Sequence, residues 1–245
     1  MKKKRLDQLL VDRGLCDRII TSERVIMAGL VFVNHNRVDK KGTLIPEDAD
    51  IELRSLNPMY VSRGGDKLAS VFPKFHIDIA NKVAMDIGSS TGGFTDYLCQ
   101  NGIKKVFAID VGTHQLHEKL RNDPRIILME NQNIRELSFS QINETVDLIV
   151  MDLSFISITK IIPLLHAFLK PTGDVVSLIK PQFELGYDEV SKGRGVITDE
   201  ALIEKAITSV EQVILESGFV IMAKEPSGVK GVHGNQEWFI HFKCL

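Results

Sequence analysis

From about residue 80 onward the chain alternates strand patterns with helix patterns, and this feature restricts the fold more than any other. Apolar, β-branched runs recur along the sequence, with helical spacing between most of them. Such alternation is typical of a parallel sheet that is buried on both faces. The expected strands are residues 82–87, 105–109, 125–130, 146–152, 174–179, 219–224 and 237–243. The sequence therefore predicts an α/β, Rossmann-like fold with a seven-stranded doubly wound sheet, whose last strand is antiparallel.

The first 57 residues follow a different pattern and predict a separate, small α+β domain. We expect a leucine-rich helix over 6–14, a second helix over 17–29, a hairpin turning at 34–36 and a strand over 49–53. The predicted organisation is a first domain over 1–57, a linker over 58–64 and a second domain over 65–245.

Positive charge is concentrated at the start of the chain. Residues 1–41 carry ten Lys and Arg against five Asp and Glu, whereas the whole chain has a formal charge of −2. A basic end on an otherwise acidic protein indicates a polyanionic partner for that end. A solvated face with scattered charges is the alternative interpretation.

Composition excludes several classes of protein. Hydrophobic residues make up 44% and charged residues 25% of the 245 residues, which is typical of a globular protein with a substantial core. Cys16, Cys99 and Cys244 are far apart and lack metal-ligand spacing, so we expect a reducing compartment and no metal. Charged residues interrupt the most apolar stretch, residues 147–169, which disfavours a membrane span. We predict a cytoplasmic protein with no membrane partner and no obligate protein partner.

A glycine-rich loop, DIGSSTGGF, follows the first strand of the predicted sheet. Small residues at this point let the backbone approach a ligand at the carboxyl edge of the sheet. Asp110 ends the second strand, where a carboxylate can accept hydrogen bonds from ribose hydroxyls. The loop is therefore compatible with a dinucleotide or with S-adenosyl-L-methionine. Asp86 favours S-adenosyl-L-methionine, because its ammonium group needs an acceptor whereas a pyrophosphate would be repelled.

Asn131 and Asn133 follow the third strand, where hydrogen bonds to an adenine edge would be made, although capping of the next helix is an equally simple role. The predicted cofactor-binding residues all follow strand ends: Asp86, Gly88, Ser89, Ser90, Thr91, Gly92, Gly93, Phe94, Asp110, Val111, Asn131, Asn133 and Asp152.

Four charged residues lie at the ends of predicted apolar strands or just ahead of the sheet, where charged side chains are not expected. Asp152 and Lys180 end the fourth and fifth strands, Glu237 begins the last strand, and Lys67 lies in VSRGGDKL ahead of the sheet. A lysine against an apolar strand end is costly unless it is paired or functional. A purely structural ion pair between Asp152 and Lys180 is the alternative.

The set Lys67, Asp152, Lys180 and Glu237 resembles the Lys-Asp-Lys-Glu tetrad of FtsJ-like RNA ribose 2'-O-methyltransferases. The whole chain resembles the TlyA family, which joins an S-four-type RNA-binding domain to such a methyltransferase domain and often has a haemolysin label. The phrases that carry the resemblance are SRGGDKL, DIGSSTGGFTDYL, DLSFIS, KPQFE and NQEWF. The resemblance implies S-adenosyl-L-methionine-dependent 2'-O-methylation of cytidine in ribosomal RNA. The end at Leu245 resembles the shorter subtype, which implies large-subunit (23S) rRNA.

The resemblance also implies roles for individual residues. Lys180 would accept the proton of the 2'-hydroxyl, Asp152 would orient Lys180, and Lys67 and Glu237 would hold the ribose. The implied RNA-binding residues, which contact phosphates of ribosomal RNA or a ribosomal subunit, are Lys4, Arg5, Arg13, Arg18, Arg24 and Arg63.

Three other functions stay open at this point. They are a non-catalytic RNA-binding protein with a vestigial methyltransferase domain, an NAD-linked oxidoreductase and a membrane-active haemolysin.

Overall fold

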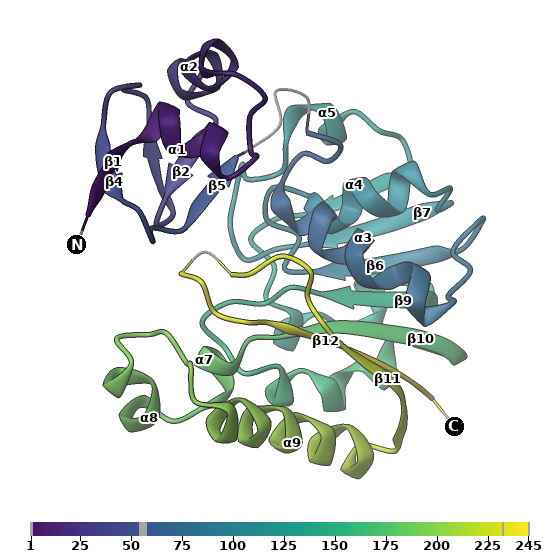
Figure 1. The fold of residues 1–245 in the computed structure, drawn as a ribbon. Helices are drawn as coiled ribbons and strands as arrows, with labels where there is room; N and C mark the ends of the chain where they lie inside the picture. The colour runs from purple at the N-terminus through teal and green to yellow at the C-terminus, as the bar shows by residue number, and fades with distance from the viewer. Residues whose placement is uncertain (1, 54–57, 232, 245) are drawn as a thin grey trace. The chain divides into compact units, whose positions relative to one another are not determined.

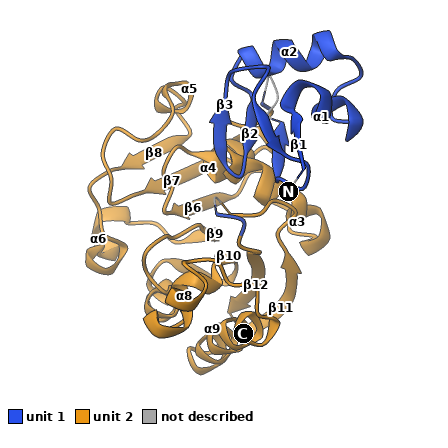
Figure 2. Ribbon diagram, turned by 60° about the vertical axis from the view of Figure 1, so that its left-hand side comes forward, with its two compact units in different colours: residues 1–58, 232–234 blue, residues 59–231, 235–245 orange. Residues whose placement is uncertain are grey.

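In a computed structural model the chain folds as two compact units (Figure 2). The smaller unit comprises residues 1–58 and 232–234, and the larger unit comprises residues 59–231 and 235–245. The structure describes residues 2–53, 58–231 and 233–244. Helix α3 begins at Arg63, so the end of the stretch predicted as a linker is helical.

The smaller unit is built from short elements, which confirm both predicted helices, the hairpin and the strand after it. Its elements are β1 Lys3–Arg5, α1 Leu6–Asp12, α2 Ile19–Met27, β2 Val31–Val33, β3 Asn36–Val38, β4 Leu44–Pro46 and β5 Ile51–Leu53. β1 pairs with β4, and β2 lies between β3 and β5, all antiparallel. β1 and β4 were not predicted, because strands of three residues are too short to show an alternating pattern.

Leucine spacing and turn chemistry explain this small fold. Leu6 and Leu10 stand one helical turn apart and are fully buried, and they pack in one cluster with Ile26. The hairpin turns at Asn34 and His35, both with positive φ, as a two-residue turn between twisted antiparallel strands requires.

The larger unit alternates strands and helices (Figure 1). In chain order its elements are α3 Arg63–Phe75, β6 Val83–Ile87, α4 Gly93–Gln100, β7 Lys105–Ile109, α5 Glu118–Arg121, β8 Ile126–Met129, η1 Ile134–Glu136, α6 Phe139–Ile142, β9 Val146–Met151, η2 Ile158–Lys160, η3 Ile162–Ala167, β10 Leu169–Ile179, α7 Pro181–Glu184, α8 Tyr187–Lys192, α9 Glu200–Glu216, β11 Phe219–Pro226 and β12 Trp238–Cys244.

All seven predicted strands form one sheet, in the order β11-β12-β10-β9-β6-β7-β8. β12 runs antiparallel to both of its neighbours, which confirms the predicted antiparallel last strand. β10 begins at Leu169, five residues before the predicted start. Its first residues, Lys170 to Gly173, include Pro and Gly, and the pairing register shifts there, so this part of the strand looked like a turn in the sequence.

Side chains from the sheet pack in two hydrophobic clusters, one on each face. Ile149 lies in a cluster with Ile207 and Val210 of α9, whereas its neighbour Val150 lies in a cluster with Leu68 of α3 and Leu98 of α4. Figure 1 shows α9 on one side of the sheet and α3 and α4 on the other. Alternate residues of the central strands thus enter opposite halves of the core.

Among the described residues, no helix combines the length and the apolar character that a bilayer span needs.

Candidate active site

The strand order reverses between β6 and β9, so the loops after these two strands diverge and leave a crevice, the usual ligand site of a doubly wound sheet. Ile87 pairs with Met151, which brings the following residues, Gly88 and Asp152, to the same edge. A cavity of about 480 Å³ opens there. The predicted cofactor residues that line it are Gly88, Ser90, Asp110, Val111, Asn133 and Asp152.

The glycine-rich loop is held close to both neighbouring strand ends. Gly88 has a φ of +84°, and a Cβ atom there would lie 2.8 Å from the carbonyl oxygen of Asp152. Ser90 and Gly112 donate backbone hydrogen bonds to the two carboxylate oxygens of Asp110, at 2.8 and 2.7 Å. Each carboxylate oxygen can accept a further hydrogen bond, so Asp110 can both fix these loops and bind ribose hydroxyls.

A second cavity, of about 150 Å³, is more polar and adjoins the first. The predicted cofactor residues that line it are Asp86, Gly88, Ser89, Ser90, Thr91, Gly93, Phe94 and Asp152, and Lys180 lines it as well. The same cavity is lined by Ser62, which precedes α3, and by Gly64 in the first turn of α3. Gly92 and Asn131 line neither cavity.

Asp86 is 1% exposed, and only one of its two carboxylate oxygens has a hydrogen-bond partner among the described residues. Thr95 Oγ1 donates a hydrogen bond of 2.6 Å to Oδ2, whereas Oδ1 has no hydrogen-bond partner among the residues described. Burial raises the pKa of Asp86 to about 7, since the charged form loses its hydration. An unpaired carboxylate oxygen in a polar cavity is suited to a cationic ligand group.

The four charged residues form two ion pairs: Lys67–Glu237 is buried, whereas Lys180–Asp152 is partly buried. Lys180 Nζ lies 2.6 Å from Asp152 Oδ1, and Lys67 Nζ donates a 2.6 Å hydrogen bond to Glu237 Oε2. Ile179 of β10 pairs with Trp238 of β12, so the next residues, Lys180 and Glu237, face each other at the sheet edge. The structure therefore brings the predicted tetrad together at one edge, although Asp152 and Lys180 also form the ion pair that was the structural alternative.

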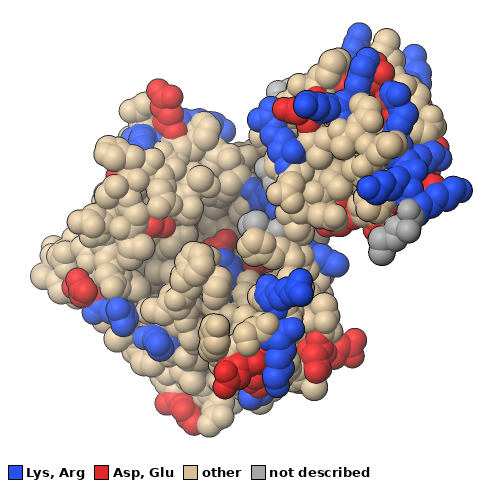
Figure 3. All heavy atoms as spheres, turned by 90° about the vertical axis from the view of Figure 1, so that its left-hand side faces the viewer, with Lys and Arg blue, Asp and Glu red and all other residues tan. Residues whose placement is uncertain are grey.

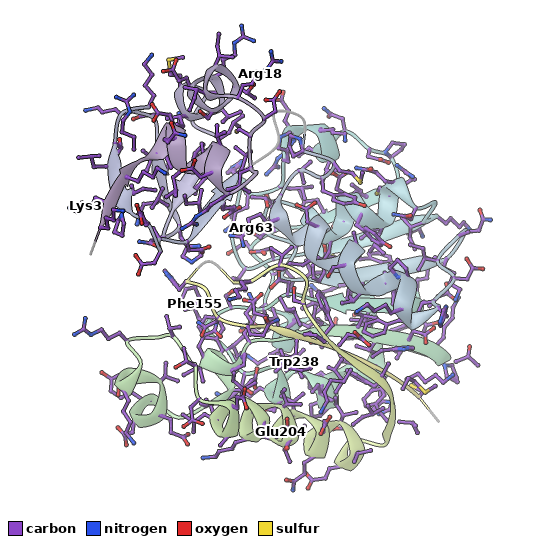
Figure 4. The ribbon with its side chains drawn as sticks, in the orientation of Figure 1. Lys3, Arg18, Arg63, Phe155, Glu204 and Trp238 are labelled. Carbon is purple, nitrogen blue, oxygen red and sulfur yellow. The ribbon has the colours of Figure 1, made fainter. Side chains whose placement is uncertain are left out.

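One face of α3 positions Lys67. Residues at helical spacing along this face contact the β11–β12 hairpin: Arg63 donates to the Lys230 carbonyl, Lys67 pairs with Glu237, Ser70 accepts from the Gly228 amide and Lys74 pairs with Glu225. The predicted RNA contact Arg63 is therefore part of a row that joins α3 to the hairpin (Figure 4).

The asparagines after β8 differ in their positions. Asn133 lines the larger cavity and also caps η1, its side chain accepting a 3.1 Å hydrogen bond from the Arg135 amide. Asn131 has a φ of +54° and donates its backbone N–H to the Gly112 carbonyl. Capping and adenine binding therefore explain the position of Asn133 equally well. Asn131 supports the loop that follows Asp110.

Several residues of the larger cavity were not predicted, and they are Ile87, Ile109, Gln115, Gln132, Ile134, Leu153, Ser154, Phe155, Ile156 and Ile161. Phe155 is the most unusual of them, because it is 91% exposed and has a φ of +64°, a conformation that bulky residues avoid. Its ring centroid lies 5.2 Å from that of Phe183, and it lies at the edge of the larger unit (Figure 4). An aromatic residue inside DLSFIS, directly after a strand end, was the available signal.

Glycines allow α3 and α4 to approach closely beside the smaller cavity. A Cβ atom at Gly93 would lie 2.8 Å from the Gly65 amide nitrogen and would overlap Ser62 Oγ. We expect Gly93→Ala to lower the free energy of unfolding by about 1–3 kcal/mol, because backbone atoms must move apart. Gly186→Ala is the matched control, since a Cβ there would meet only Glu189 Oε2 at 3.6 Å. Equal thermal unfolding of the two variants would contradict this packing.

Comparison with known proteins identifies both parts of the chain. Residues 60–244 match the FtsJ-like methyltransferase family, and residues 4–51 match the S4 domain. The chain belongs to the FtsJ-like methyltransferase family. Two related proteins are Hemolysin A of Brachyspira hyodysenteriae, 42% identical over 97% of this chain and 99% of that protein, and the 16S/23S rRNA (cytidine-2'-O)-methyltransferase TlyA of Mycobacterium tuberculosis, 36% identical over 98% and 89%.

Solved structures support the same family and fold. A protein from Streptococcus thermophilus that is described as a candidate hemolysin is 38% identical, with a TM-score of 0.78 over 100% of this chain and 89% of that one. The fibrillarin/Nop5p complex, at 19% identity and a TM-score of 0.53 over 74% and 83%, shares the fold alone. The predicted methyltransferase fold, the S-four-type domain and the TlyA-like family are confirmed.

The S4 domain holds most of the predicted phosphate-binding cations, and Lys and Arg side chains cover much of its visible face in Figure 3, at upper right. Several of these cations have acidic neighbours: Arg5 forms a two-pronged contact with Asp7, Lys4 pairs with Asp12, and Arg18 lies 3.2 Å from Asp17. Arg24 lies exposed on α2. The Lys4–Asp12 and Arg18–Asp17 pairs are largely exposed, so they contribute little to stability and can exchange their partner for a phosphate, whereas Asp7 is buried.

Arg13 differs from the other cations of the S4 domain, because it donates hydrogen bonds to the carbonyl groups of Ala49, at 2.7 Å, and Glu47. We expect Arg13→Ala to destabilise the segment before β5 by about 1 kcal/mol. Arg24→Ala is the control, expected to weaken RNA binding without this local effect. Amide hydrogen exchange at residues 47–51 separates the two roles, and equal exchange in both variants would contradict the structural role of Arg13.

In the described part of the FtsJ-like methyltransferase domain and of the S4 domain, no three His, Cys, Asp or Glu residues cluster in a way that could hold a metal ion.

Proposed function

We propose that this FtsJ-like methyltransferase transfers the methyl group of S-adenosyl-L-methionine to the 2'-hydroxyl of a cytidine in ribosomal RNA, with large-subunit (23S) rRNA as the target. The name of the Mycobacterium tuberculosis relative supports the reaction and the substrate class. The S4 domain supports an RNA partner, since its cations can contact phosphates without reading sequence. A cytoplasmic location agrees with this substrate.

The two cavities fit S-adenosyl-L-methionine. The smaller one presents two buried polar groups without hydrogen-bond partners in the described chain, Asp86 Oδ1 and Ser89 Oγ, as the ammonium and carboxylate of its amino-acid end require. The larger one presents Asp110 for the ribose hydroxyls and Asn133 for the adenine edge. When bound, the cofactor supplies a methyl group that its sulfonium already activates.

The two lysine–carboxylate pairs carry the proposal, and Lys180 and Asp152 of one pair line the smaller cavity. Lys67 and Lys180 are each only 8% exposed, and burying a lysine is costly unless the site uses it. We infer that Lys180 Nζ in its neutral form accepts the proton of the 2'-hydroxyl, while Asp152 holds the resulting ammonium. Lys67 and Glu237 hold each other beside this pair and can bind the ribose.

Phe155 supplies an aromatic face for the target nucleotide. RNA-binding proteins commonly stack unpaired bases on aromatic side chains, and each such contact contributes about 1–3 kcal/mol. Phe155 is highly exposed, lines the larger cavity and has its ring centroid 5.2 Å from that of Phe183 in a tilted arrangement, so most of its ring is free to contact a base. An unpaired nucleotide stacked there would place its sugar near Lys180.

Methyl transfer from tritiated S-adenosyl-L-methionine tests this function directly. Purified large subunits, small subunits and protein-free rRNA serve as substrates, and we expect label in 23S rRNA. A chain that binds RNA but transfers no label to any of these substrates would support the non-catalytic RNA-binding alternative. Label that enters only ribosomal proteins would also contradict the proposal.

A further inference from the structure

The loop between β9 and η2 places a hydroxyl group against Lys180. Lys180 Nζ donates a hydrogen bond of 2.8 Å to Ser154 Oγ and lies 2.6 Å from Asp152 Oδ1. In the described residues Asp152 Oδ1 has no partner with hydrogen-bond geometry, so its contact with Lys180 is electrostatic. Ser154 therefore provides the directional contact of this amine.

A neutral lysine amine has two N–H groups and one lone pair, arranged tetrahedrally with the bond to Cε. The hydrogen bond to Ser154 fixes one N–H and with it the rotation about the Cε–Nζ bond. Two positions then remain, and the Asp152 carboxylate attracts the second N–H and repels the lone pair. The lone pair is left with a single direction.

We propose that Ser154 is a positioning residue that aims the Lys180 lone pair at the 2'-hydroxyl proton. This inference rests on the proposed function. Lys180 Nζ takes the proton and becomes an ammonium, while an electron pair of the 2'-oxygen forms the bond to the methyl carbon. The carbon–sulfur bond breaks in the same step, and its electrons leave with sulfur as a neutral thioether.

Ser154 occupies the point where the two cavities meet, because it lines both of them, together with Asp152. Its loop is fixed to α7 independently of any substrate. Glu184 accepts hydrogen bonds from the Ile158 amide, at 3.1 Å, and from the Ser157 hydroxyl. The end of the loop that leads into η2 is thus fixed before RNA arrives, as a positioning role for Ser154 requires.

Ser154→Ala removes the hydroxyl, and Ser154→Thr is the matched control that keeps it. Ser154 is exposed, so neither change disturbs the core. We expect Ser154→Ala to lower kcat about tenfold, with an unchanged KM for RNA and an unchanged Kd for S-adenosyl-L-methionine. The pH at which the rate is half-maximal should also move in Ser154→Ala. Ser154→Thr should keep the wild-type kcat and pH profile.

The outcomes separate this inference from the proposed function. Wild-type kcat and pH profile in Ser154→Ala, beside an inactive Lys180→Ala, would overturn the role of Ser154 alone. A raised KM with normal kcat would also overturn it, since Ser154 would then contact substrate. An active Lys180→Ala would instead contradict the proposed base.

A measurement that needs no RNA keeps the inference testable. We expect acetic anhydride to modify Lys180 several-fold faster in Ser154→Ala than in the wild type or Ser154→Thr, because the amine has lost its hydrogen bond. Peptide mass spectrometry measures the rates. Equal rates in all three proteins would overturn the contact on which the inference depends.

Discussion

Lys180→Ala is expected to reduce the rate of methyl transfer by about 10²–10⁴-fold, because it removes the group that accepts the 2'-hydroxyl proton. Affinity for S-adenosyl-L-methionine should stay near that of the wild type, since the ammonium and adenosine contacts come from other residues. Single-turnover transfer to rRNA measures the first effect and calorimetry the second.

Lys160→Ala is the matched control for Lys180→Ala. Lys160 is an exposed lysine at the end of η2, in the segment that follows the β9–η2 loop, so this variant truncates the same type of side chain outside both cavities. We expect near wild-type turnover from it. Activity of Lys180→Ala within tenfold of the wild type would show that another group accepts the proton.

Asp86→Asn is expected to weaken binding of S-adenosyl-L-methionine about 10–100-fold at pH 8, as the loss of a charge-assisted hydrogen bond to the ammonium group predicts. Asp86 Oδ1 is buried and unpaired within the described chain, so it can accept a hydrogen bond from the ligand without giving up a contact with the protein. Glu189→Gln, which changes a carboxylate of α8 outside both cavities, is the control and should bind normally.

The pH dependence of binding has a definite sign. The pKa of Asp86 is about 7 in the free chain, and a bound ammonium would lower it by favouring the carboxylate. Affinity should therefore increase as pH rises from 5 to 7 and then level off, with proton release on binding near pH 6. Calorimetry in two buffers of different ionisation enthalpy measures the release. If binding by the wild type did not change with pH, Asp86 would not be the acceptor for the ammonium group.

The same raised pKa predicts an effect on stability. The folded state keeps the Asp86 proton to about pH 7, whereas the unfolded chain loses it near pH 4. The contribution of Asp86 to the free energy of unfolding therefore decreases as pH rises through this window. At pH 8 the ligand-free Asp86→Asn variant should unfold at a higher temperature than the wild type, and this difference should vanish near pH 4.

The sheet was predictable from the sequence because its strands are buried on both faces and carry continuous apolar runs, as at residues 148–151. Helix α3 was not predicted. Its first turn contains two glycines, which are poor helix formers, and its capping residue Ser62 makes no side-chain cap. What stabilises α3 is tertiary contact, including the close approach of Gly93 and the pair between Lys67 and Glu237.

The site was predictable only at strand ends. Topology places such residues at one edge, which is why Asp152 and Lys180 could be expected to meet. Phe155 and Ser154 belong to a loop that is fixed by the half-buried carboxylate of Glu184, and no local pattern specifies that contact. Likewise, the carbonyl partners of Arg13 lie more than thirty residues away in the sequence, so its structural role could not be read from its charge.

The position of the transferred methyl group tests the central claim most directly. A 2'-O-methyl group removes the hydroxyl that alkali needs to cleave the next phosphodiester bond. Tritium-labelled rRNA, hydrolysed completely in alkali, should therefore yield its label in an alkali-resistant dinucleotide with cytidine on the 5' side. Label recovered in a mononucleotide would place the methyl group on a base, and the account of a lysine that deprotonates a sugar hydroxyl would be wrong.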